Sequence, residues 1–481
     1  MAVSPPLIDE STGHEAADGL RAPLRYWAAA AILIGVFMAT LDSSIVNIAL
    51  PTIAARLHTD AATATWAVTA YQMASAATVL TFAALAQRLE PSTVYARGLA
   101  AFVAASLACA LAPTIGWLVA FRTAQGLACA AIVSVGIGLY RSVVPARMLG
   151  SVLGINALVV AAGAAAGPAV GGILLTVADW RALFYVNVPL GAAGWVIARK
   201  ALAAVRTVAP PLQGGFDWPG AVLAAAAMSL VVAGVDGLGR RSHVGSIVLF
   251  SCGALLILAF ALVQQAAGPR ALLPLDLCSR RFSTAAITSM LTFVAQGSAL
   301  VALPFLLQTG YGYTPIESGL ILLAWPLAVA VAAPLAGRLA DRADGRRVAT
   351  TGLALFAFGL GALAMLPGAG AHPAEAAIIW RAAVAGAGFG LFQTPNNREM
   401  LSVVDKPRTG MASGVLATAR TLGQSIGAAL VAVVLVNFTQ AGEAVAKGSS
   451  TGWPIGTALW IACASGCAAA ALSASRQMRR R

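Results

Sequence analysis

The stretch TLDSSIVNIALP, residues 40–51, places one carboxylate, that of Asp42, deep in the first apolar segment of the chain. A charged carboxylate is costly inside a bilayer, so an acid retained there usually has a function. The rest of the 481-residue sequence is equally apolar, with 59% hydrophobic and 10% charged residues and a mean hydropathy of +0.82. Soluble domains carry roughly 25% charged residues. The composition therefore predicts an all-α polytopic membrane protein.

Apolar segments long enough to cross a bilayer recur along the whole chain, since each crossing needs about 20 residues. Short polar turns or turns marked by proline and glycine separate them. We expect fourteen spans, at 27–50, 63–86, 94–112, 115–139, 149–176, 182–204, 217–236, 244–265, 282–308, 315–337, 347–367, 375–397, 410–436 and 453–475.

Basic residues orient these spans. If the N-terminus is cytoplasmic, most of the 31 lysines and arginines fall in inner loops and tails, as the positive-inside rule requires. The exceptions are Arg56, Arg181, Arg240, Arg241 and Lys447 outside, and Arg122, Arg381 and Arg420 within spans. This asymmetry accounts for the net charge of +13 without nucleic acid as a partner. We expect both termini in the cytoplasm and the chain in the plasma (inner) membrane.

An internal repeat divides the chain. Residues 83–102 align with 337–356 without gaps, and each copy joins the second span of a six-span block to the third. Both blocks have the same orientation, which is typical of transporter halves related by an axis along the membrane normal. The expected divisions are a disordered tail 1–26, a bundle 27–204, a linker 205–281 with two extra spans, a bundle 282–475 and a basic tail 476–481.

Four ordered motifs carry a family resemblance. Residues 41–51 resemble the first-span signature of the fourteen-span drug:proton antiporters of the major facilitator superfamily. The runs WAVTAY (66–71), RTAQG (122–126) and 163–191 resemble its second, fourth and fifth spans with the following loop. The resemblance implies a major facilitator fold of two six-helix bundles plus two central extra helices. It also implies proton-driven export of amphipathic drugs or other small molecules by alternating access, powered by the proton gradient without a cofactor.

Asp42 and Arg122 are the candidates for proton coupling. Asp42 lies about 22 Å along its span and Arg122 about 10 Å along a span of opposite direction, so both sit at similar depth. Desolvation and a nearby guanidinium shift the pKa of a carboxylate in opposite directions, so a small change in surroundings can make it gain or lose a proton. The alternatives are a static ion pair, or a hydrogen bond from Asp42 to Asn47 or to the backbone. The resembled family has an arginine at the Arg122 position and implicates it in proton transfer.

Two further motifs point to gating and helix packing. Glycines recurring every four residues form a small stripe that lets helices approach closely, and in the resembled family this span lies where the halves meet. The segment 337–347 resembles the family's cytoplasmic gating loop, whereas in the first-half copy Gln87 replaces the acid, which puts the latch there in doubt. The candidates are Gly163, Gly167, Pro168, Gly171, Gly172, Gly337, Asp341, Arg342 and Arg346.

Aromatic and polar residues within the spans are candidates for lining an amphipathic cavity, although each is individually more typical of core or lipid-facing positions. The candidates are Phe37, Trp66, Tyr71, Glu317, Trp325, Phe392 and Arg420. Arg420 equally suits a helix anchor. No pattern supports catalysis, a metal site or a phosphate-binding glycine loop, so we expect no enzyme and no ATP-driven pump.

The sequence leaves three functions open. The first is a proton-driven exporter whose partners are the lipid bilayer, protons and a small amphipathic substrate, acting as a monomer. The second is a dedicated exporter of one native metabolite or self-made antibiotic. The third is a non-transporting membrane sensor or scaffold, which the lack of a sizeable soluble stretch disfavours.

Overall fold

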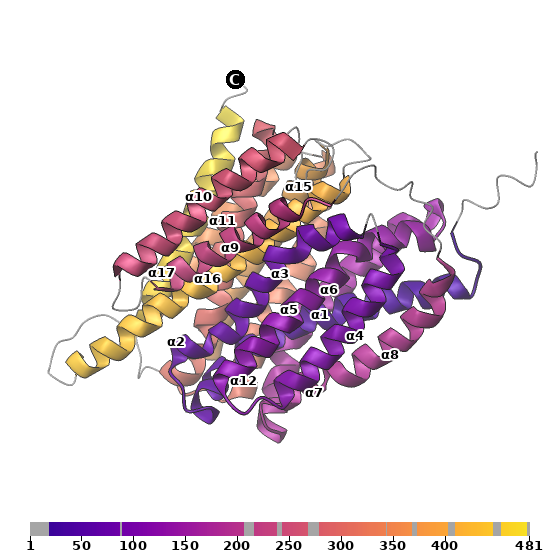
Figure 1. Cartoon of the computed structure of the whole chain (residues 1–481). Helices are drawn as coiled ribbons and strands as arrows, with labels where there is room; N and C mark the ends of the chain where they lie inside the picture. The colour runs from indigo at the N-terminus through magenta and orange to yellow at the C-terminus, as the bar shows by residue number, and fades with distance from the viewer. Residues whose placement is uncertain are drawn as a thin grey trace, which may run out of the picture.

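The computed structural model describes residues 19–86, 89–205, 216–237, 243–267, 279–342, 344–367, 373–402, 409–445 and 454–478. Every regular element in these ranges is helical, and fourteen helices are long and apolar enough to cross a membrane. The predicted all-α, fourteen-span fold class is confirmed. Figure 1 shows the indigo and violet helices of the first half lying beside the orange and yellow helices of the second.

The N-terminal bundle contains the first six spans. Its helices are α1 (Leu24–Arg56), α2 (Ala61–Ala64), α3 (Trp66–Leu85), α4 (Pro91–Ala110), α5 (Ile115–Val143), α6 (Ala146–Val177), α7 (Ala182–Tyr185) and α8 (Asn187–Ala201), followed by a 3-10 turn, Leu202–Ala204. The second span is thus α2 with α3 and the sixth is α7 with α8.

The C-terminal bundle repeats this order after the two extra helices, α9 (Trp218–Gly237) and α10 (His243–Ala267). Its helices are α11 (Arg280–Phe305) with a π turn (Leu306–Gly310), α12 (Pro315–Leu322), α13 (Ala324–Arg342), α14 (Gly345–Ala364), α15 (Glu375–Ser402), α16 (Thr409–Val445) and α17 (Pro454–Met478). Helix α9 packs on both α3 and α16, so the extra pair covers a seam between the two bundles.

The internal repeat is visible in the packing of α4 and α14. Both are 20-residue helices, beginning directly after Glu90 and Asp344, which are aligned positions. The aligned glycines Gly98 and Gly352 each lie where a side chain would collide with the next helix, α5 or α15. The two halves therefore use the same close helix contact at equivalent places.

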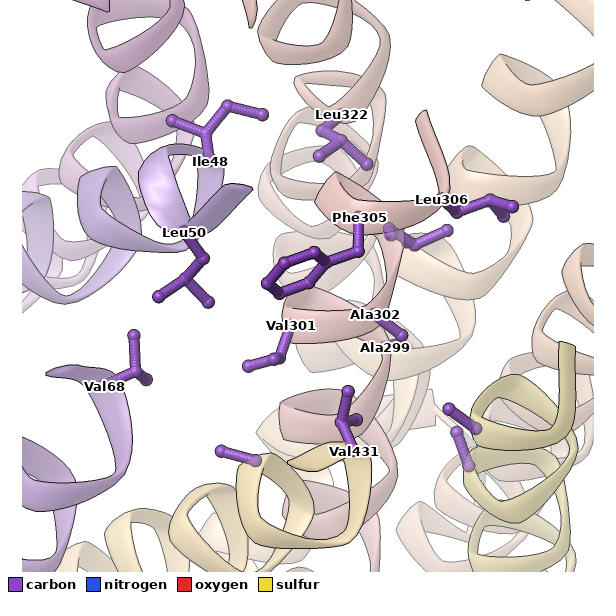
Figure 2. Close-up of a cluster of buried hydrophobic side chains, with 14 of the residues drawn as sticks. Ile48, Leu50, Val68, Ala299, Val301, Ala302, Phe305, Leu306, Leu322 and Val431 are labelled. Atoms are coloured by element: carbon purple, nitrogen blue, oxygen red, sulfur yellow. The ribbon is translucent and has the colours of Figure 1, made fainter. Parts of the chain in front are cut away.

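The bundles meet in an apolar seal near the end of the molecule that carries residues 57–60 and 311–314. Figure 2 shows the Phe305 ring of α11 directed toward Leu50 of α1, with Val68 and Val431 nearby. All four side chains belong to one buried cluster that spans both halves. Burial of this apolar surface holds the halves together at this end.

Helix α6 lies where the two halves meet, and its glycine stripe packs within the N-terminal bundle. A Cβ at Gly163, Gly167 or Gly171 would meet α1, which is in the same bundle. The contact between halves lies beside the stripe: a Cβ at Gly172 would come within 2.7 Å of the Pro315 carbonyl oxygen, and one at Gly319 would overlap that of Pro168. The stripe thus builds the N-terminal bundle, while its neighbouring face meets α12.

Candidate functional site

Asp42 and Arg122 form a fully buried ion pair between α1 and α5. Arg122 Nη1 lies 2.5 Å from Asp42 Oδ2, and neither side chain is exposed. The sequence expectation that the two lie at similar depth is consistent with this contact. A buried pair is costly to desolvate and stable only when additional hydrogen bonds satisfy its polar atoms.

Two amides complete the coordination of the carboxylate. Gln125 Nε2 and Asn187 Nδ2 both donate to Asp42 Oδ1, at 2.9 and 2.7 Å. Gln125 lies on α5 one turn from Arg122, and its Oε1 accepts from Arg122 Nη1 at 2.6 Å. Its amide nitrogen also lies 2.8 Å from the Ser106 hydroxyl oxygen of α4. Four helices, α1, α4, α5 and α8, therefore contribute to one polar network.

The guanidinium is held from its other sides as well. Arg122 Nε donates to the Ala67 carbonyl oxygen of α3 at 2.7 Å, and its Cζ lies 4.1 Å from the centre of the Tyr71 ring. The Phe184 ring lies farther away, at 5.8 Å. Arg122 Nη2 is buried without a hydrogen bond among the described residues. The pair is therefore sealed under aromatic rings in this conformation.

Sequence reasoning missed the contributions of Gln125, Ser106 and Asn187. Gln125 and Asn187 stand inside the quoted motifs, and polar side chains in apolar spans were the available signal. The alternative partner, Asn47, does not contact the pair: its Nδ2 donates to the Ser43 carbonyl oxygen of its own helix at 3.2 Å.

The candidate cavity residues do not share one site. Tyr71 covers Arg122, whereas Trp66 Nε1 donates to Asp236 Oδ2 of α9 at 3.2 Å and so faces the extra helices. Trp325 and Phe392 are buried within the C-terminal bundle, where Trp325 contacts the Phe356 ring edge-on. Phe37 and Arg420 are half-buried.

Glu317 requires a correction. It is exposed and closes a capping box with Thr314 at the start of α12: its Oε2 accepts from the Thr314 backbone N–H at 2.8 Å. A glutamate at the third helical position after threonine satisfies free backbone donors, so this acid serves the helix end and does not line a cavity.

The gating segment also has partners that the sequence did not suggest. Arg346 of α14 forms a half-buried ion pair with Glu399 of α15, with Nη2 2.9 Å from Oε1. Asp344 caps α14 by accepting from the Arg346 backbone N–H at 3.1 Å. Arg342 is exposed, and a Cβ at Gly337 would meet the Thr394 side chain at an ordinary contact distance of 3.9 Å. The Asp341 side chain and all of Gln87 lie outside the described residues.

The protein consists of two helical bundles of the same orientation, with a buried ion pair in one of them. This is the architecture of a polytopic membrane transporter. The family model described as Major Facilitator Superfamily matches residues 32–214 and 285–476. The chain belongs to the major facilitator superfamily. Among the described residues, no group of three or more His, Cys, Asp or Glu side chains is placed to hold a metal ion.

Known proteins resemble the chain over most of its length. "Uncharacterized transporter YebQ" of Escherichia coli (strain K12) is 41% identical over 430 residues, covering 89% of this chain and 93% of that protein. "Multidrug resistance protein Stp" of Mycobacterium tuberculosis (strain CDC 1551 / Oshkosh) is 31% identical over 414 residues, covering 85% and 75%. The solved structure of peptide transporter POT in complex with sulfate shares the fold, with a TM-score of 0.68, 14% identity and coverage of 98% and 99%.

Proposed function

We propose that the chain is a proton-driven exporter of small amphipathic molecules that works by alternating access. The observation that carries the proposal is the Asp42–Arg122 pair, in which a carboxylate buried in the membrane bonds to side chains of α5 and α8. Similarity to a protein named for multidrug resistance supports export of this kind of substrate.

In the proposed cycle, the ionised carboxylate of Asp42 holds Arg122, Gln125 and Asn187 together. A proton on Asp42 removes the negative charge 2.5 Å from Arg122 Nη1. The uncompensated guanidinium then favours a conformation in which it reaches solvent or another partner, because a buried unpaired charge is strongly disfavoured. Since a proton binds the two conformations unequally, it shifts their equilibrium.

The apolar seal around Phe305 and the α6–α12 contact separate the two membrane faces in the proposed cycle. With the N-terminus in the cytoplasm of a bacterial cell, the sealed end faces outward. Inward proton flow then drives opening of the seal for substrate release. One chain carries the whole network, so the proposal is a monomer that uses the proton gradient and no cofactor.

The test is export by Asp42→Asn in proteoliposomes with an imposed pH gradient, measured with rhodamine 6G and fluorescein as separate probes. Asparagine is nearly isosteric with aspartate but cannot exchange a proton, so we expect gradient-dependent export of either probe to disappear. Addition of an uncoupler should likewise abolish gradient-dependent export of either probe by the natural chain.

The matched control is Asp60→Asn. Asp60 lies between spans and caps α2 by accepting from the Thr63 backbone N–H at 2.8 Å, which asparagine can also do. This variant should export normally. Full gradient-driven export by Asp42→Asn would refute the coupling role and leave the pair as a static element of the bundle.

A further inference from the structure

Arg420 of α16 is a cation deep in the membrane without an acidic partner. It makes no ion pair with a carboxylate in the part of the chain that the structure describes, and its electrostatic neighbours there are Tyr71 and Cys129. Both neighbours lie in the other bundle, on α3 and α5. An arginine in a membrane span is costly and normally pairs or faces a water-filled space.

Arg420 lies at the contact between the two bundles. Its side chain is half-buried, and its helix α16 packs on α3 of the first bundle. Other residues of α16 also contact the first bundle: the Ser425 hydroxyl donates to the Thr69 carbonyl oxygen of α3 at 3.3 Å, and Ala417 packs against the cluster of Val79, Leu80 and Ala130. Arg420 lies between these two contacts.

The Tyr71 hydroxyl can donate and accept a hydrogen bond. It is buried without a hydrogen bond of good geometry among the described residues, and the Cys129 thiol is its side-chain neighbour. Gln424, one helical turn from Arg420, donates its amide to Gln296 Oε1 at 3.2 Å. A guanidinium offers five N–H donors and no acceptor. An anionic oxygen makes the strongest hydrogen bonds with a guanidinium, and the Tyr71 hydroxyl can donate to the same group.

We propose that Arg420 is the counter-ion for an anionic substrate, binding a carboxylate or phenolate group of an amphipathic molecule held between the bundles. This inference rests on the proposed export function and names the substrate class for it. Tyr71 connects the two sites, because its ring lies against Arg122 while its hydroxyl is within electrostatic range of Arg420. Binding of an anion at Arg420 thus affects the Asp42–Arg122 pair through the Tyr71 side chain.

The test is equilibrium binding to the full chain in nanodiscs without a proton gradient, measured by fluorescence anisotropy. The probes are fluorescein, which carries a carboxylate and a phenolate, and rhodamine 6G, a cation with a related ring system. Binding does not require coupling. If proton-driven export is refuted, the binding measurement can still be made. If binding shows the opposite charge preference, the proposed export function is unaffected.

We expect the natural chain to bind fluorescein more tightly than rhodamine 6G. Arg420→Gln should weaken fluorescein binding by about tenfold or more, the effect of losing a charge-assisted hydrogen bond, with little change for rhodamine 6G. Arg420→Lys should keep the anion preference at lower affinity, and Arg420→Glu should reverse it. The control is Arg381→Gln, another arginine in a span, whose Nη1 donates to the Ala377 carbonyl oxygen of its own helix.

Circular dichroism and gel-filtration profiles check that each variant is folded. If Arg420→Gln and Arg420→Glu do not fold, the test rests on Arg420→Lys. A natural chain that prefers rhodamine 6G would overturn the proposal. So would equal weakening of both probes by Arg420→Gln, which marks a structural role, or loss of anion preference in the folded Arg420→Lys variant.

Discussion

Asp42 illustrates how a single buried charge depends on side chains distant in sequence. Its two oxygens accept from Arg122, Gln125 and Asn187, and the last of these stands 145 residues away in the chain. Each donor offsets part of the cost of removing the carboxylate from water. Removing one donor leaves an oxygen of a buried ion less well satisfied.

At this scale we predict that Asn187→Ala destabilises the protein by about 1–3 kcal/mol, because it removes one of the two amide donors to Asp42 Oδ1. Chemical or thermal unfolding in detergent would measure the loss. Asn47→Ala is the matched control, since that amide bonds only to its own helix. An equal loss in both variants would show that the contact with Asp42 contributes nothing specific.

Helix α6 presents two different faces to its neighbours. The stripe of Gly163, Gly167 and Gly171 packs on α1, and Gly172 with Pro168 meets α12 of the other bundle. Backbone-to-backbone contact of this kind leaves no flexible side chain to move aside. The α6–α12 contact can therefore close only when both helices lack side chains there.

We predict that Gly319→Ala shifts the population away from the sealed conformation. Its added Cβ would overlap the Pro168 carbonyl oxygen. Overpacking costs about 1–3 kcal/mol, and a coupling of that size changes a two-state ratio about 5–150-fold. Pulsed electron paramagnetic resonance between spin labels at exposed Arg56 and Glu375, both at the sealed end, should show longer distances.

The control for this shift is Gly154→Ala, on α6 itself, where an added Cβ meets no atom within 4 Å. That variant should leave the distance distribution unchanged. Identical distributions for Gly319→Ala and the natural chain would mean that the α6–α12 contact does not control opening.

The whole molecule is two similar halves bridged by a helix pair that neither half contains. Helix α9 contacts α3 and α16, and the Asp236–Trp66 hydrogen bond fixes it to the first bundle. Because the extra helices number two, the second half keeps the orientation of the first. This parity is what permits a parallel repeat in one membrane.

The corresponding prediction concerns topology. In a chain with its six cysteines replaced, single cysteines at Glu90 and Asp344 should react with a membrane-impermeant thiol reagent from the cytoplasmic side. Cysteines at Asp60 and Asp179 should react from the outer side, as the distribution of basic residues requires. Labelling of positions 90 and 344 from opposite faces would contradict the parallel repeat.

The sequence by itself determined the class of protein, the fourteen spans and the position of a carboxylate inside the first span. These follow from local hydropathy and from the high cost of charge in a bilayer, which single segments reveal. Arg122 could be matched to Asp42 because depth in a membrane is readable from span position. The four motifs extended this to the family.

The tertiary structure decided which polar groups converge. Gln125 and Asn187 meet Asp42, Trp66 turns to Asp236 on an extra helix, and Glu317 caps α12 at the surface. Glu317 follows Thr314 in a capping-box pattern that is local in sequence. No local pattern distinguishes the other outcomes, because the rotation of each helix about its axis depends on packing against all its neighbours. The position of Arg420 within electrostatic range of Tyr71 of the other bundle has the same origin: hydropathy places a residue in the membrane, and helix packing determines its neighbours.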